Sequence, residues 1–233
     1  MKKIVAFIAA AEHGKDTAAE RLLASPDWIR LAFGDALYLE VSQAFKVSVE
    51  KLRDRKTKET DVSWMALKNC NDMLFVKVVG LCAGVSTKVV SAAVHFLSTG
   101  KTTKDVPQRA VKAFINKKRS PRFILQLWGT EYKRKFMDRD SYWLDIVMDA
   151  VSATSKNVVI TDCRFPNEAD AVENKGGVLV RIVRPALVER DKNAQRAQHI
   201  SEKALADRPV HRTLVNVEGN LNKLWESVDS LFD

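Results

Sequence analysis

The sequence predicts an α/β fold in which a parallel β-sheet is covered by helices on both faces, giving three layers. Two observations lead to this prediction. Five short runs are apolar throughout, as strands buried on both faces of a parallel sheet are. Segments with helical periodicity separate most of these runs, and parallel neighbours need such crossovers. The expected strands are residues 4–9, 29–33, 158–161, 178–183 and 213–216.

Helix signals fit between these strands. Residues 17–23 have helical periodicity and stop before Pro26, residues 36–45 follow the second strand, and residues 167–174 end at Gly176. Proline and glycine are the usual residues just beyond the end of a helix. The connections are therefore those of a sheet with a helix between successive strands.

A long helical stretch interrupts the sheet. From about residue 47 to 150 no segment resembles a strand, and helical patterns lie around residues 64–81, 89–97, 107–115, 121–136 and 142–153. We expect a single domain over 1–233, with a helical substrate-binding insertion at about 47–150. A second excursion, at about 185–207, is long enough to be a mobile lid.

The composition is typical of a globular protein of the cytosol. Hydrophobic residues make up 46% of the 233 residues and charged residues 29%, which allows a sizeable core. No apolar run approaches the roughly 18 residues that span a bilayer, so we expect no membrane partner. Cys70, Cys82 and Cys163 are odd in number and lack metal-type spacing. We expect them to be reduced thiols packed as small apolar residues.

The net charge of +9 is concentrated in one segment. Between Lys101 and Arg134, ten Lys and Arg residues stand against two acidic residues. Such a segment can bind nucleic acid, line a pocket for a phosphorylated small molecule, or form a solvated face. Its aromatic residues Phe123, Trp128 and Tyr132 have helical spacing, which favours packing in the core over stacking on bases.

The most informative motif follows the first strand. Residues 10–17 read Ala-Ala-Glu-His-Gly-Lys-Asp-Thr, and a helical segment comes next. A turn between strand and helix gathers backbone N–H groups and the positive end of the helix dipole, and a lysine adds its charge. The motif predicts a triphosphate site, with an ordinary strand–turn–helix as the alternative. Its residues are Ala11, Gly14, Lys15, Asp16 and Thr17.

Two positions depart from the general phosphate-loop pattern. Ala9 stands where glycine is usual, and it can make the turn if its φ stays negative. Asp16 stands where Ser or Thr is usual. Its carboxylate is unfavourable near phosphates unless a magnesium ion lies between them or the side chain turns away, with Thr17 supplying the hydroxyl.

The strand at residues 158–161 ends in a carboxylate, Asp162, and Arg164 follows. Ligands bind at the carboxyl ends of the strands in open parallel sheets, so Asp162 is expected at the same edge as Lys15. There it can hold magnesium through water, or it can simply cap the following turn. A cation at this edge suits phosphate recognition, which makes Arg164 a candidate binding residue.

A helix start signal, Ser120 followed by proline, precedes Arg122 and Gln126, which lie four residues apart on one helix face. An arginine fork matches a monophosphate, and a Gln amide can recognise a base edge with one donor and one acceptor. Arg134 is a candidate for the same pocket. The alternative is that these side chains only face solvent.

Five segments occur in an order that resembles one family. They are Gly-Lys-Asp-Thr from Gly14, Ser-Pro-Arg-x3-Gln-x2-Gly-Thr-Glu from Ser120, Asp-x-Arg-Phe-Pro-Asn-Glu-Ala from Asp162, Gly-Gly-x-Leu-Val-Arg-Ile-x-Arg-Pro from Gly176, and His-Ile-Ser-Glu from His199. Over most of its length the chain is similar to bacteriophage-type deoxynucleoside monophosphate kinases of the phosphate-loop superfamily. The similarity is weakest at residues 47–118. Asp16 is usual in that family, whereas Ala9 is a departure.

The resemblance implies a phosphate-loop kinase fold with strand order 2-3-1-4-5, ATP as donor, a deoxynucleoside monophosphate as acceptor, and Mg²⁺. Lys15 and the loop amides would hold the donor's β and γ phosphates, with Thr17 and Asp162 near the metal. Arg122 and Arg164 would bind the acceptor phosphate. The candidate lid arginines are Arg184, Arg190 and Arg196.

The resemblance also suggests acceptor contacts. Asp35 lies in a segment similar to the family's substrate-side run. His199, with Ser201 and Glu202 beside it, would order the lid or the acceptor site; an exposed lid histidine is the alternative. If the chain is phage-encoded, its compartment would be the host cytoplasm.

Other functions stay open from the sequence. A dephospho-coenzyme A or phosphomevalonate kinase would share the loop, and a non-catalytic nucleic-acid-binding protein would use the basic segment beside a relic loop. We expect small-molecule nucleotides as partners, and we regard nucleic acid as the less favoured partner. The apolar helix at residues 89–97 is a candidate homodimer face.

Overall fold

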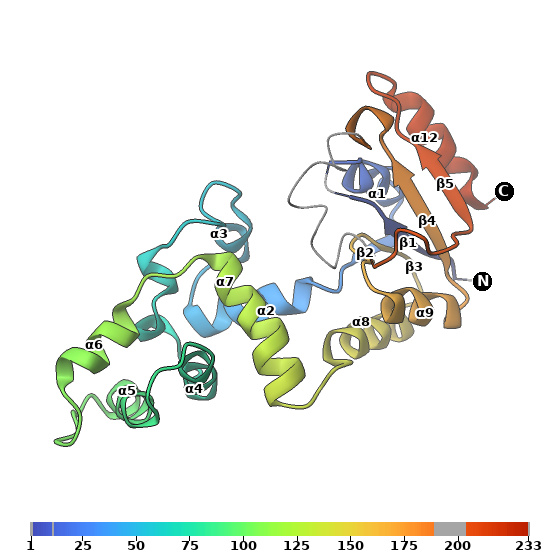
Figure 1. Ribbon diagram of the computed structural model, residues 1–233. Helices are drawn as coiled ribbons and strands as arrows, with labels where there is room; N and C mark the ends of the chain where they lie inside the picture. Colours follow the sequence, from blue (N-terminus) through green and yellow to red (C-terminus); the bar gives the residue numbers. More distant parts are fainter. Residues whose placement is uncertain (1, 11, 189–203, 233) are drawn as a thin grey trace. The chain divides into compact units, whose positions relative to one another are not determined.

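The computed structural model describes residues 2–10, 12–188 and 204–232 (Figure 1). It contains two compact units. Unit 1 comprises Met1–Gly34 and Leu144–Asp233, and unit 2 comprises Asp35–Trp143. The sequence suggested an insertion at about 47–150 within a single domain, and that domain organisation stays a prediction.

Unit 1 contains a parallel sheet. Its strands are β1 (Ile4–Ile8), β2 (Trp28–Leu31), β3 (Asn157–Ile160), β4 (Val178–Val183) and β5 (Arg212–Val215). The order is β2-β3-β1-β4-β5 and every neighbouring pair is parallel. The expected fold class and strand order are confirmed, and each expected strand bound lies within two residues of the observed one.

Helices cover both faces of this sheet (Figure 1). The helices of unit 1 are α1 (Lys15–Leu23), α9 (Pro166–Asn174), α12 (Leu221–Asp229), the short η5 (Ser230–Phe232), and α8 (Tyr142–Ala153) from Leu144 onward. Val5 and Phe7 of β1 pack with α1 and α12, whereas Ile4 and Ala6 pack with α8 and α9. Because both faces are buried, β1 is apolar at every position.

Unit 2 is helical. Its elements are α2 (Asp35–Phe45), α3 (Val49–Arg53), η1 (Ser63–Met65), η2 (Leu67–Asn69), α4 (Met73–Cys82), α5 (Thr87–Thr99), α6 (Gln108–Asn116), α7 (Pro121–Gln126) and η3 (Leu127–Phe136). The η3 segment is wound as a π-helix. Every residue of this unit is described, and none lies in a β-strand, as the sequence predicts.

The helix expected over residues 64–81 is wrong in its first half. Two 3₁₀ turns occupy that part, and α4 begins only at Met73. Asp72 caps α4 by accepting a hydrogen bond from the backbone N–H of Phe75, at 2.9 Å. A capping Asp marks the first residue outside a helix, and this signal overrides the apolar spacing before it.

The aromatic residues of the basic segment pack largely as expected. Trp128 and Tyr132 are buried in the core of unit 2, whereas Phe123 is 43% exposed, so the prediction is wrong for Phe123 alone. The apolar residues of α5 also enter this core, including Val90 and Ala93. That packing gives no support to α5 as a dimer face, and a homodimer stays a prediction.

The cysteines are free thiols. Burial raises the pKa of Cys70 to about 12 and lifts the pKa of Cys163 well above its usual range, because a thiolate is disfavoured away from water. Cys82 is exposed. The expectation of packed thiols is thus right for Cys70 and Cys163 and wrong for Cys82. Separately, the described helices include none long and apolar enough to cross a membrane.

We predict that Gly177→Ala destabilises unit 1. Gly177 precedes β4, and a Cβ there would lie 2.9 Å from the backbone oxygen of Val172 and 2.9 Å from Ile4 Cγ2. Overpacking of this kind costs about 1–3 kcal/mol. Urea unfolding followed by circular dichroism measures the loss. The control is Gly176→Asn, since Gly176 has φ 72 with open space around it and asparagine tolerates that conformation. Equal midpoints for both variants would contradict the prediction.

Candidate functional site

The loop between β1 and α1 turns through two left-handed residues, Glu12 with φ 69 and Gly14 with φ 101. Ala9 is not among the described residues with positive φ. The negative φ that alanine needs in order to replace glycine at this turn is therefore present. Gly14 is the N-cap of α1. The first N–H groups of a helix have no partner inside the helix, and glycine has no side chain to occupy them. The loop can therefore offer these donors to an anion.

Asn216, which directly follows the edge strand β5, holds this loop by a hydrogen bond. Its Nδ2 donates to the backbone oxygen of His13 at 2.9 Å, and its backbone N–H donates to Val183 O at 2.8 Å. A Cβ on Gly14 would overlap Asn216 Nδ2 and lie 3.3 Å from Asn216 Cγ. Only glycine fits at position 14 with Asn216 in this place.

His13 forms the second attachment of the loop. The ring is 6% exposed, and its Nδ1 accepts the backbone N–H of Arg184 at 3.1 Å. Because Nδ1 accepts, the ring proton of the neutral form lies on Nε2. The loop is thus bound to the residues that follow β4 and β5 as well as to β1.

The first turn of α1 carries the predicted donor-binding side chains. Lys15 Nζ and Asp16 Oδ2 form an ion pair at 2.8 Å, with the Asp16 side chain 69% exposed and that of Lys15 20% exposed. An exposed ion pair contributes little, so a phosphate can replace Asp16 as the partner of Lys15. Thr17, in the same turn, is half-buried.

Asp162 lies just beyond β3, which pairs with both β1 and β2. Its two carboxylate oxygens accept the backbone N–H groups of Phe33 at 2.7 Å and Gly34 at 2.9 Å. Asp162 therefore joins the end of β3 to the chain after β2. A carboxylate can accept more than two hydrogen bonds, so these two bonds do not by themselves exclude a water-mediated role in metal binding.

Glu168 organises the segment that carries Arg164. It is 5% exposed, and its Oε2 accepts the backbone N–H groups of Arg164 at 2.8 Å and Phe165 at 3.1 Å. These bonds satisfy donors at the start of α9. The exposed Arg164 side chain therefore projects from a backbone of fixed conformation.

The predicted acceptor residues of unit 2 lie on α2, α7 and η3. Arg122 pairs with Glu59 and Asp35 pairs with Arg53, both partners being partly exposed. Gln126 is exposed at the end of α7, and Arg134 is half-buried in η3. The predicted helix start is confirmed, because Ser120 Oγ accepts the backbone N–H of Phe123 at 3.2 Å.

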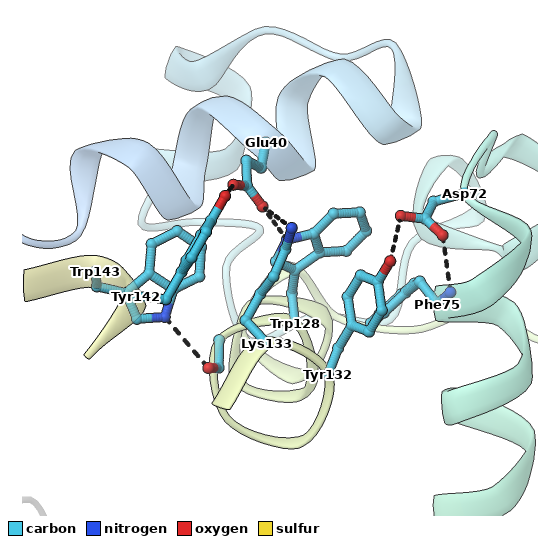
Figure 2. Close-up of polar contacts among 9 residues, drawn as sticks. Glu40, Asp72, Phe75, Trp128, Tyr132, Lys133, Tyr142 and Trp143 are labelled. Atoms are coloured by element: carbon cyan, nitrogen blue, oxygen red, sulfur yellow. Dashed lines mark hydrogen bonds and ion pairs between the residues drawn. The ribbon is translucent and has the colours of Figure 1, made fainter. Parts of the chain in front are cut away.

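Figure 2 shows how two carboxylates hold η3 in place. Glu40 of α2 accepts hydrogen bonds from Trp128 Nε1, at 2.8 Å, and from the Tyr142 hydroxyl, and it pairs with Lys133 Nζ at 3.0 Å. Burial, followed by the bond to Glu40, raises the pKa of Tyr142 to about 12. The hydroxyl therefore keeps the proton that it donates to Glu40 at neutral pH.

Asp72 holds the other side of η3 (Figure 2). It accepts from the Tyr132 hydroxyl at 2.8 Å, and burial together with this bond raises the Tyr132 pKa above its usual range. Trp143 Nε1 donates to Gly129 O at 3.2 Å. Because π-helical turns are rare but frequent at functional sites, these contacts mark η3, which follows Gln126 and contains Arg134, as an element held in a defined position.

Arg184 follows β4 and pairs with Glu218, Nη2 to Oε1, at 2.6 Å. Its Nε is buried, and no group in the described part of the chain accepts its proton. A buried donor of this kind suits an anionic ligand. Five predicted lid and acceptor residues lie outside the described residues: Arg190, Arg196, His199, Ser201 and Glu202. Ala11 of the loop also lies outside them.

The residues present fit a magnesium ion that keeps most of its water. Among the described residues, no group of three or more His, Cys, Asp or Glu side chains could hold a metal. Mg²⁺ is usually bound through one or two protein oxygens, several waters and substrate phosphates. The Thr17 hydroxyl and the Asp162 carboxylate are donors of that kind.

The sequence predictions did not include His13 or Glu59 as site residues, and they placed Asn216 and Glu218 only by position, in the tail after the last strand where related kinases often contact adenine. Asn216 directly follows the last strand, so its place at the carboxyl edge of the sheet was the available signal. His13 stands inside the loop motif itself. The ion-pair partners of Arg122 and Arg184 gave no local signal, because each lies tens of residues away in sequence.

A loop with this geometry at the carboxyl edge of a parallel sheet of this order, with a lysine in the first helical turn, is typical of the phosphate-loop class of nucleotide-binding proteins. A family model described as deoxynucleotide monophosphate kinase matches residues 3–228. The chain belongs to this family.

Two relatives bear the same kind of name. The deoxynucleoside-5'-monophosphate kinase of Escherichia phage T5 is 26% identical over 100% of this chain and 97% of its own length. A putative deoxynucleotide monophosphate kinase of Acanthamoeba polyphaga mimivirus is 33% identical over 31% of this chain and 43% of its own. A solved structure, TT1252 from Thermus thermophilus, aligns over 100% of this chain and 98% of that one, with 15% identity and a TM-score of 0.42.

Family membership confirms the expected enzyme class, a kinase that phosphorylates deoxynucleoside monophosphates. It does not favour the other kinases that share the loop, nor a nucleic-acid-binding protein with a relic loop.

We predict that Asn216→Ala weakens binding of the phosphate donor. The substitution removes the hydrogen bond to His13 O, worth about 1 kcal/mol, so KM for the donor rises by about fivefold. Steady-state kinetics at varied donor concentration measure it. Asn116→Ala, at an exposed position of α6, is the control. An Asn216→Ala enzyme with the wild-type KM would show that the attachment has no part in donor binding.

Proposed function

We propose that this enzyme transfers the γ-phosphoryl group of ATP to the phosphate of a deoxynucleoside monophosphate, with Mg²⁺ as the metal. The observation that carries the proposal is the loop before α1. Gly14 has φ 101, space for a Cβ is lacking, and the loop is tied to the ends of β4 and β5. A loop fixed in this way is preorganised for phosphates.

On the donor side, the loop amides and Lys15 hold the β and γ phosphates. Asp16 gives up its exposed ion pair with Lys15 when phosphate arrives, since such pairs are weak. Arg184 closes on the transferring group, its buried Nε being a donor that the described residues leave unused. Arg190 and Arg196 act with it as lid arginines.

On the acceptor side, Arg122 binds the monophosphate and Gln126 recognises the base edge. Arg122 is paired with an exposed Glu59, and a phosphate dianion offers its fork a better bidentate partner. Arg164 contributes a second cation. The remaining acceptor contacts are assigned to Asp35, Arg134, His199, Ser201 and Glu202.

Catalysis in this scheme comes from position and charge. Phosphoryl transfer needs the two phosphates in line and the charge of the migrating group neutralised, and it needs no covalent intermediate. Mg²⁺, held by Thr17 and by Asp162 through water, would neutralise donor charge. The arginines and Lys15 bind the oxygens of the migrating group, and the lid excludes water.

A coupled ADP-release assay tests the proposal. It uses ATP and Mg²⁺ with each of the four natural deoxynucleoside monophosphates and with dephospho-coenzyme A. We expect turnover with at least one deoxynucleotide. Lys15→Ala lowers kcat by about a hundredfold or more, and Arg122→Ala raises KM for the deoxynucleotide.

Matched controls are Lys77→Ala and Arg109→Ala, at exposed positions of α4 and α6, which keep wild-type rates. Full activity in Lys15→Ala would refute the donor assignment. An unchanged KM in Arg122→Ala would refute the acceptor assignment.

A further inference from the structure

A cavity of about 770 Å³ opens in unit 2, where α2 ends and α4 begins. Its volume lies in the range of small-molecule sites. Polar residues on its wall include Lys46, Lys51, Trp64, Lys68 and Asn69. None of the residues assigned above to the donor, the acceptor or the metal lines it, so the cavity has no part in the proposed reaction.

The cavity is positively charged. Three lysines line it, and its wall contains no acidic residue. Within the described chain, none of the three ammonium groups has a carboxylate partner, whereas other basic side chains of unit 2 do, as Lys133 has Glu40. Neighbouring like charges without counter-charges raise each other's energy, and an anion of several charges relieves that repulsion.

Lys46 is held in an unfavourable backbone conformation. It follows the last residue of α2 with φ 53, a position where glycine is the usual residue. Left-handed backbone in a non-glycine residue is strained, and such strain gathers at functional positions. A glycine would fit the turn better, so a lysine here is explained if its ammonium group is used.

Trp64 adds an aromatic surface to these charges. The side chain is half-buried, and Lys51 Nζ lies 4.7 Å from its ring centroid. Met73 and Leu97 provide apolar wall beside it. An indole next to cations suits a planar aromatic ring that carries phosphates, because the base stacks while the phosphates take the charges. Asn69 can meet a base edge with its amide oxygen, its Nδ2 being bonded to Ser63 O at 3.0 Å.

We propose that this cavity is a second nucleotide site that binds a nucleoside triphosphate. Its phosphates contact Lys46, Lys51 and Lys68, and its base stacks on Trp64. The second site is argued from unit 2, but the expected total of two nucleotides per chain rests on the proposed function, in which the donor loop binds the first.

Equilibrium dialysis with radiolabelled dATP, dCTP, dGTP, dTTP and ATP tests it by counting nucleotides bound per chain. We expect two per wild-type chain with at least one of these nucleotides. The triple variant Lys46→Gly, Lys51→Ala, Lys68→Ala should bind one, its second site weakened by about tenfold or more. The triple control Lys77→Ala, Lys88→Ala, Lys112→Ala removes equal charge from exposed positions outside the cavity and should still bind two.

A folding defect is separated by a melting curve, since Lys46→Gly relieves backbone strain and Lys51 and Lys68 are exposed. A loss of one nucleotide in Lys15→Ala reports on the donor site alone, whereas the same number of nucleotides bound by the wild type and by the triple variant would overturn the proposal. So would a raised KM for the deoxynucleoside monophosphate in the triple variant, because the cavity would then be the acceptor site. Inorganic tripolyphosphate that binds the cavity as tightly as the nucleotides would rule out a nucleotide as the ligand.

Discussion

The close contact between Gly14 and Asn216 is the constraint on which the donor site depends. Gly14 has φ 101, and Asn216 occupies the space where a Cβ would point. Asn216 is in turn held by its backbone bond to Val183. The loop after β1 therefore takes its shape from residues that follow β4 and β5, which the sheet order brings beside it. The shape of the anion site therefore depends on the strand order of the sheet.

Some charged groups of this protein support the fold, and others are available to a ligand. In unit 2, Glu40 and Asp72 have their hydrogen-bonding capacity used by Trp128, Lys133 and two tyrosine hydroxyls. A half-buried carboxylate whose hydrogen bonds are satisfied in this way fixes the side chains around it, and removing one partner is costly. The ion pairs of Lys15 and Arg122 are more exposed, so they can exchange a carboxylate for a phosphate at small cost. The first group keeps the supporting helices in place, and the second group leaves Lys15 and Arg122 able to bind phosphate.

The sequence predicted the features that have local signals. The apolar run of β1, the glycine and lysine of the loop, and the helix start at Ser120 depend on neighbouring residues, and the structure agrees with them. The strand order came only from the resemblance to a family. The attachment of the loop was not predicted, because His13 and Asn216 meet across about two hundred residues. The 3₁₀ turns before α4 were missed because apolar spacing there imitates a helix.

The most direct test of this account is calorimetric titration of ATP into the wild type and the Gly14→Ala variant. Gly219→Ala is the control, because Gly219 has a comparable positive φ of 72 but open space around it. The account predicts that Gly14→Ala stays folded in its sheet and loses ATP affinity by about a hundredfold or more, while Gly219→Ala keeps it. Equal ATP affinity in Gly14→Ala and wild type would contradict the claim that this glycine shapes the phosphate site.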